Sequence, residues 1–82
     1  MTDVVLDPAL WESVEAGAEA LIEEWLVAEG DHVRAGQTLA RANLIHTSVD
    51  VPASHAGLVE EIVVPAGQNF AQGAVLARLI AT

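Results

Sequence analysis

Hydrophobic and polar residues alternate along much of the chain in short runs that end near glycines. The run Leu58–Pro65 is rich in β-branched residues and ends in a proline, which is typical of a strand. Ala20–Val27 is a similar apolar run that contains two glutamates. Two glycines six residues apart follow each run, and glycines so placed favour turns between short strands. The pattern predicts strand, turn, short strand, turn and strand, twice over.

The two runs belong to an internal repeat. Residues 20–41 align without a gap with residues 57–78 at an offset of 37, and nine of the 22 aligned positions are identical. A hairpin spanning residues 43–54 would join the two halves. We therefore expect residues 1–82 to form a single all-β domain, in which two small sheets pack face to face with pseudo-two-fold symmetry.

A long helix is the alternative for the first third of the chain. Asp7 and Pro8 form a good helix start, apolar residues then recur at helical spacing, and Gly30 would make a fitting stop. Gly17 argues against this helix, because glycine in a helix interior costs about 1 kcal/mol relative to alanine. Copies of a repeat should also share a conformation. We predict a strand over Ala20–Val27 and leave open a helical turn within Leu10–Ala16.

Composition and charge narrow the function further. With 82 residues and no cysteine, the chain has neither disulfides nor thiolate metal sites, and 52% of its residues are hydrophobic. Trp11 and Trp25 are expected in or beside the core. Twelve carboxylates and three arginines give a net charge of −9, and the chain contains no lysine. This charge disfavours nucleic acid and anionic membranes and favours a basic protein partner, unless it serves solubility alone.

Two stretches that span most of the chain resemble a known family. "WLVAEGDHVRAGQTLA" and "VDVPASHAGLVEEIVVPAGQNFAQGAVLARL" are similar to the lipoyl/biotinyl carrier domains of 2-oxo acid dehydrogenase acyltransferases and biotin carboxyl carriers. "PALWESVEAG" (residues 8–17) also resembles the opening strand and loop of that family, although the spacing between Gly17 and Trp25 is about three residues longer than usual. The resemblance implies a flattened barrel of two four-stranded antiparallel sheets.

The resemblance also implies a site at the tip of the hairpin. There the family carries a lysine that is amidated by lipoate or biotin, within Asp-Lys in lipoyl members and Met-Lys-Met in biotinyl members. Counting back from Val51, Pro52 and Ala53 places Ile45 and His46 at the tip, with His46 at the lysine position. Imidazole does not supply the primary amine that the amide needs. We therefore predict no lipoyl or biotinyl arm on a lysine, and no cofactor.

The tip is also unusual as a turn. A tight hairpin favours Asn, Asp or Gly at its tip, and isoleucine adopts positive φ poorly. We therefore predict a hairpin that shifts or widens, with Asn43 in the left-handed conformation. The predicted recognition residues are Asn43, Ile45, His46, Thr47 and Ser48. The residues predicted to shape turns are Gly30, Asp31, Gly36, Gly57, Gly67 and Gly73.

Other candidate sites are weaker. His32, His46 and His55 lack the short spacing of a zinc motif, so no metal site is predicted. The pairs Glu23-Glu24 and Glu60-Glu61 should each place one carboxylate on either face of a strand, because side chains alternate. We interpret these glutamates as solvated positions or as an acidic patch for a basic partner. With no catalytic group fixed near His46, we predict no enzyme activity.

The sequence thus supports a cytoplasmic, non-catalytic docking or scaffold module of an acyl- or carboxyl-transfer system, whose partner would be a dehydrogenase or carboxylase component. The location follows from the absence of an apolar run of 18 residues and of a basic N-terminal region. The alternative is a carrier-type subunit with an unorthodox attachment at His46, Thr47 or Ser48.

Overall fold

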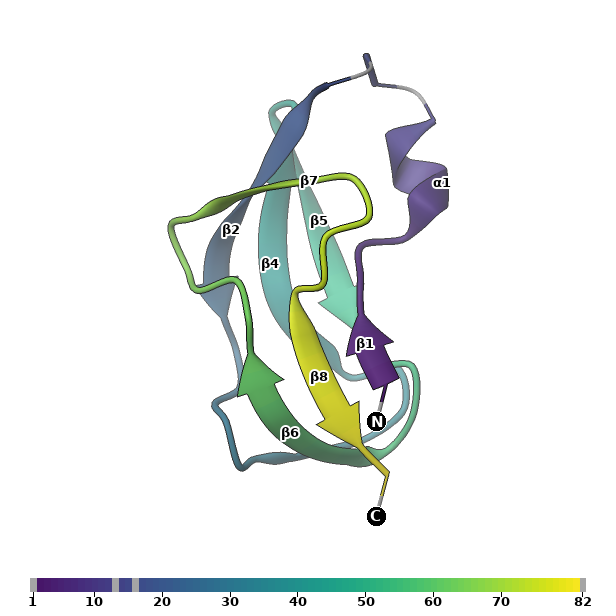
Figure 1. Cartoon of the computed structure of the whole chain (residues 1–82), viewed down its shortest axis with the longest axis vertical. Coiled ribbons are helices and arrows are strands. Elements are labelled where there is room, and N and C mark those ends of the chain that lie inside the picture. Colours follow the sequence, from purple (N-terminus) through teal and green to yellow (C-terminus); the bar gives the residue numbers. More distant parts are fainter. Residues whose placement is uncertain (1, 13, 16, 82) are drawn as a thin grey trace.

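The computed structural model describes residues 2–12, 14–15 and 17–81 of the chain. One short helix and eight strands make up its regular structure over these residues (Figure 1). In chain order they are β1 (Thr2–Val4), α1 (Pro8–Trp11), β2 (Glu19–Trp25), β3 (His32–Val33), β4 (Thr38–Leu44), β5 (Thr47–Pro52), β6 (Gly57–Ile62), β7 (Asn69–Ala71) and β8 (Ala77–Ile80).

The strands form two four-stranded antiparallel sheets, which confirms the predicted fold class. The first sheet has the order β1-β8-β6-β3 and the second has the order β5-β4-β2-β7. Every pairing within them is antiparallel. Each half of the repeat places its short middle strand in the sheet of the other half, because β3 pairs with β6 and β7 pairs with β2. The two halves are thereby interlocked.

Two backbone hydrogen bonds also join the two halves of the repeat, and they are related by its symmetry. The Gly30 N–H donates to the Val59 carbonyl at 2.7 Å, and the Gly67 N–H donates to the Ile22 carbonyl at 2.8 Å. The two donors lie 37 residues apart, as do the two acceptors, so each bond is the image of the other under the pseudo-two-fold axis. The symmetry seen in the repeat is therefore present in the hydrogen bonds that join the halves.

The first third of the chain is strand and loop with one helical turn. Asp7 caps α1 through a bond from the Ala9 N–H to its Oδ1 at 3.0 Å, and Pro8 opens the helix. The helix ends at Trp11, and β2 begins at Glu19. The long helix is therefore wrong and the strand predicted from the repeat is confirmed. The likeness of residues 8–17 to an opening strand is also wrong, because the opening strand is Thr2–Val4 and residues 8–11 are helical.

The core is aliphatic apart from two aromatic side chains. Trp11 and Phe70 are both buried, and their rings meet edge to face with centroids 6.1 Å apart. Trp25 is half-buried, and its Nε1–H donates to the Val64 carbonyl at 2.8 Å. Trp11 and Trp25 thus lie in or beside the core, as expected, and Phe70 is also buried. The Trp25 bond adds a further tie between the repeat halves.

The Glu-Glu pairs differ from the prediction. The register of β2 shifts between Ile22 and Glu24, and that of β6 shifts at the equivalent place, between Val59 and Glu61. Such an irregularity breaks the alternation of side chains between faces. Both glutamates of each pair are consequently exposed, and the predicted split across the two faces is wrong.

Gly57 does not serve a turn. It is buried at the start of β6, and a Cβ at this position would overlap the carbonyl oxygen of Ile80. Close approach of two strands, rather than positive φ, therefore requires glycine here. The other four predicted glycines do have positive φ, between 81° and 93°: Gly30, Gly36, Gly67 and Gly73.

Candidate functional site

The β4–β5 hairpin ends in a two-residue turn. The pairing of the two strands continues to Leu44 and Thr47, which leaves only Ile45 and His46 in the turn. Their φ angles are +50° and +63°, and these are the only positive φ values among the described residues other than glycine. Positive φ at both central positions is the signature of a type I′ turn, whose twist matches the strands that it joins.

The prediction for this turn is wrong. The hairpin neither shifts nor widens, and Asn43 is not in the left-handed conformation. Asn43 remains in β4 opposite Ser48, and its Oδ1 accepts a hydrogen bond from the His46 N–H at 3.1 Å. Burial of Leu44 at the end of β4 holds the register. The strand pairing and this burial therefore impose a left-handed backbone on Ile45, which costs about 1–2 kcal/mol.

The side chains of the turn are exposed. The hairpin tip lies at the end of the molecule opposite the two chain termini (Figure 1). His46, Thr47 and Ser48 are exposed, and Ile45 is 53% exposed. The Ser48 hydroxyl donates to Glu23 Oε1 at 2.8 Å, which links the hairpin to β2. The predicted recognition residues are thus brought together at one accessible tip.

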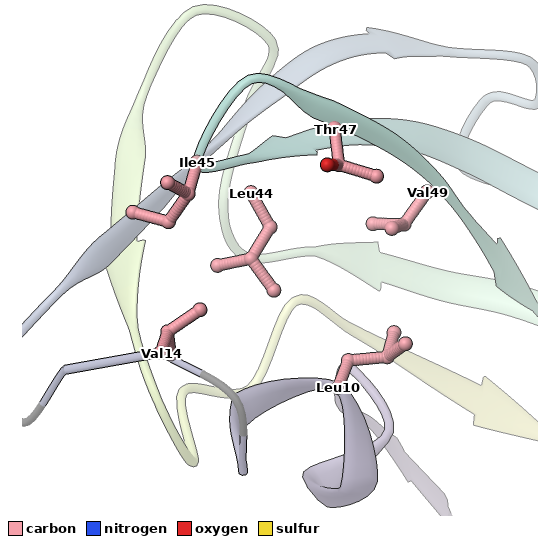
Figure 2. A pocket seen from close by; sticks show the side chains of 6 residues that line it. All are labelled: Leu10, Val14, Leu44, Ile45, Thr47 and Val49. Carbon is pink, nitrogen blue, oxygen red and sulfur yellow. The ribbon is translucent and has the colours of Figure 1, made fainter.

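An apolar pocket beside the tip was not predicted from the sequence. It has a volume of about 300 Å³ and lies between α1 with the segment that follows it and the β4–β5 turn (Figure 2). The helical spacing of Leu10 and Val14 and the longer connection before Trp25 are the sequence signals that could have indicated it. Its lining residues are Leu10, Val14, Leu44, Ile45, Thr47 and Val49.

The three histidines lie on separate elements. His32 is in β3, His46 is at the tip and His55 is in the loop before β6. Among the described residues, no group of three His, Cys, Asp or Glu side chains is placed to hold a metal ion. His55 has a structural role: its Nδ1 donates to the Ala56 carbonyl at 2.7 Å, and its Nε2 lies 2.8 Å from the Thr2 hydroxyl. It thereby connects β1 to the loop between the sheets.

Glu24 and Glu61, the second residues of the two Glu-Glu sequences, are exposed and form salt bridges. Each contacts the arginine of the neighbouring strand, and the same arginine contacts an aspartate on the adjoining edge strand. The distances are 3.6 Å for Arg41–Glu24, 3.9 Å for Arg41–Asp50, 2.9 Å for Arg78–Glu61 and 3.6 Å for Arg78–Asp3. These carboxylates belong to two symmetry-related surface clusters and do not converge on one site.

Among the described residues, no helix is long and apolar enough to cross a membrane.

Comparison with known proteins places the chain among carrier domains. The profile of the biotin/lipoyl family, described as "Biotin-requiring enzyme", matches residues 4–79. The chain is 42% identical over 60 residues to the dihydrolipoyllysine-residue acetyltransferase component of the pyruvate dehydrogenase complex of Rhizobium meliloti. It is 33% identical over 72 residues to the lipoamide acyltransferase component of the branched-chain alpha-keto acid dehydrogenase complex of Bacillus subtilis.

These matches cover 73% and 88% of this chain, but only 13% and 16% of the two relatives. The chain is thus similar to one domain of each. Among solved structures, it is similar to the lipoyl domain of the 2-oxoglutarate dehydrogenase complex of Azotobacter vinelandii. The TM-score is 0.71 at 22% identity, over 82% of this chain and 85% of that one. With its two interlocked sheets and exposed hairpin, the chain belongs to the biotin/lipoyl family and has the fold of a lipoyl domain.

Proposed function

We propose that this domain is a docking or scaffold module that has kept the carrier fold without a lysine to modify, and that it associates with an acyl- or carboxyl-transfer system. Domains of this family carry groups and are not themselves catalysts, so the domain is not an enzyme. We propose further that residues 1–82 act as one unit, with repeat halves of about 20–41 and 57–78 joined by the hairpin 43–54.

The residue at the tip carries the proposal. We assign His46 to the position of the attachment lysine, because it is the second residue of the exposed two-residue turn, as in the Asp-Lys pair of lipoyl members. The chain offers no lysine elsewhere. A short imidazole differs from a lysine in both reach and chemistry.

Lipoate or biotin is the group that the family implies, and the residues present do not fit its usual attachment. An amide arm requires a primary amine, whereas the tip presents an imidazole and the hydroxyls of Thr47 and Ser48. The Ser48 hydroxyl already donates to Glu23. We therefore infer that the domain works without a covalently bound cofactor.

Relatives in dehydrogenase complexes support a protein partner of that kind. The two acyltransferase components named above are parts of pyruvate and branched-chain alpha-keto acid dehydrogenase complexes. We propose a dehydrogenase or carboxylase component as the partner. A cytoplasmic location and the lack of nucleic-acid or membrane binding stay predictions from composition and charge.

The test is a mass measurement on protein isolated from its own cells. Trypsin should release the peptide Ala42–Arg78, which contains the whole hairpin. We expect this peptide at its unmodified mass. A lipoyl, biotinyl or acyl adduct on His46, Thr47 or Ser48 would overturn the proposal and support the carrier-type alternative with an unorthodox attachment.

The variant His46→Lys is the matched control. Incubated with a lipoate or a biotin ligase and its substrates, the natural sequence should remain unmodified. The variant supplies the missing amine at the same φ-positive position, so we expect one of the two ligases to modify it on the Ala42–Arg78 segment. Modification of both proteins alike would show that His46 is not the decisive position.

A further inference from the structure

We propose that the pocket between α1 and the β4–β5 turn is a docking site for an apolar side chain that lies within a positively charged segment of a partner protein. The inference rests on the proposed docking function and deepens it by naming the surface and the chemistry of the partner.

The pocket has the lining and size to hold one apolar side chain. Of the six described residues that line it, five have aliphatic side chains, and Thr47 provides a hydroxyl (Figure 2). At about 300 Å³ it lies at the lower end of the range of ligand pockets, which is roughly 300–1,000 Å³. A second hollow of about 280 Å³ adjoins it and shares Val14 and Ile45. Ile45 thus stands between two apolar hollows.

Ile45 is the least expected residue on this surface. It is half-exposed, and its φ of +50° is one that Gly, Asn or Asp adopts with less strain. A strained residue with an exposed apolar side chain adds nothing to the stability of the turn. Strain of this kind is concentrated at binding and catalytic sites, where it is retained for contact with a ligand.

The charged residues around the pocket are acidic and favour a basic partner. Glu15 lines the second hollow, Glu12 directly follows α1, and Glu23 accepts the hydrogen bond from Ser48 beside the turn. Among the described residues that line the two hollows there is no arginine, and Arg41 and Arg78 belong to the ion-pair clusters described above. A basic segment is therefore attracted to this end of the domain.

The same charge disfavours the other occupants. A second copy would bring together two chains with a formal charge of −9 each, and an anionic lipid surface would be repelled as well. A hydrophobic residue flanked by lysines or arginines satisfies both the apolar lining and the acidic surroundings.

The two halves of the molecule differ in the connection that borders this pocket. β5 continues to β6 through the short connection 53–56, whereas β1 continues to β2 through residues 5–18, which include α1. Since β5 and β1 occupy equivalent edge positions in the two sheets, the longer connection breaks the symmetry at the hairpin tip. The added segment supplies Leu10 and Val14, two of the five aliphatic side chains that line the pocket.

The experiment is an NMR titration of the ¹⁵N-labelled domain with a defined peptide. The probe has a central leucine between two pairs of arginines. Two comparison peptides replace the leucine by serine or the arginines by glutamates. We expect the first peptide to shift the amide signals of the six lining residues and to bind at least about tenfold more tightly than either comparison peptide.

Two pairs of variants separate docking from folding. Ile45→Asn replaces the aliphatic side chain between the two hollows but suits the backbone of the turn, so it should weaken binding about tenfold without loss of thermal stability. Its control, Leu26→Asn, alters another exposed apolar residue and should leave binding unchanged. Glu15→Gln should weaken binding about twofold to threefold, whereas Glu60→Gln on the other half should not.

Equal binding of the leucine and serine peptides, shifts confined to other surfaces, or no effect of Ile45→Asn would overturn the inference. Stronger shifts of the same signals by free lipoamide than by the basic peptide would overturn it in favour of a small-molecule site. The titration uses unmodified recombinant domain, so its result is independent of the peptide-mass test. An adduct at the tip would end the proposed function alone, and failed titration would end the docking site alone.

Discussion

The two strand pairs that carry the arginines invite comparison, because the repeat makes them equivalent and the chain uses them differently. In the first half, β4 pairs with β5 through a continuous hairpin, and the chain turns at Ile45 and His46. In the second half, β8 pairs with β1, a strand from the opposite end of the chain, and no turn joins them. The ladders are alike, with Arg41 opposite Asp50 and Arg78 opposite Asp3. The difference shows that pairing, rather than the turn, determines the geometry of this edge.

The turns after β2 and β6 show the same structure reached with different residues. In the first half the Ala28 N–H donates a hydrogen bond to Asp31 Oδ2 at 2.9 Å. The equivalent residues in the second half are Pro65 and Gln68. Proline has no N–H to satisfy, so the carboxylate is not needed there. The two turns therefore differ in their residues, but neither leaves a backbone N–H without a partner at this position.

The largest expected difference between the halves concerns Gly57 and its counterpart Ala20. Gly57→Ala should destabilise the domain by about 1–3 kcal/mol, because the added Cβ overlaps the backbone of Ile80 and the strands must move apart. Ala20→Gly removes a buried Cβ and should cost about 0.5–1 kcal/mol. Urea unfolding of both variants measures the difference. An equal cost would mean that β6 and β8 are not held at this close distance.

The second test concerns the turn that only the first half possesses. Ile45→Gly should stabilise the domain by about 1 kcal/mol, because glycine adopts the left-handed backbone without the strain borne by isoleucine, even after its greater chain entropy is counted. Val63→Gly, at an exposed apolar position of the second half without positive φ, should not stabilise. Thermal unfolding of the two variants and the natural sequence measures both effects. A loss of stability with Ile45→Gly would show that isoleucine is not strained in this turn.

The smallest expected effect concerns the two arginine clusters. Arg78→Met should destabilise by up to about 1 kcal/mol, and Arg41→Met by less, because exposed ion pairs contribute little and the Arg78–Glu61 contact is the shorter at 2.9 Å. Raising the salt concentration should reduce both differences. Chemical unfolding at low and high salt gives the measurement. An Arg41 effect larger than that of Arg78 would reverse the ranking.

The sequence was informative wherever the repeat supplied two versions of one element. The apolar run Ala20–Val27 has helical spacing, and only its alignment with the β-branched run Leu58–Pro65 identified it as a strand. The local sequence pattern gave wrong predictions at positions where tertiary contacts, rather than the conformational preference of the residue, determine the backbone. Gly57 was expected in a turn and is required by packing, and Asn43 was expected to bend the chain and instead supports a turn at Ile45 and His46.

The sequence by itself determined the all-β class, the two-fold repeat and the lack of an amine at the hairpin tip, because these depend on residue identity and periodicity. The tertiary structure alone decided the exchange of β3 and β7 between sheets, the tight turn and the apolar pocket against α1. Those features arise from contacts between segments that lie far apart in the chain, and local preferences do not encode such contacts. At Ile45 the strand pairing and the burial of Leu44 outweigh the strain of about 1–2 kcal/mol, so a residue poorly suited to positive φ occupies the turn.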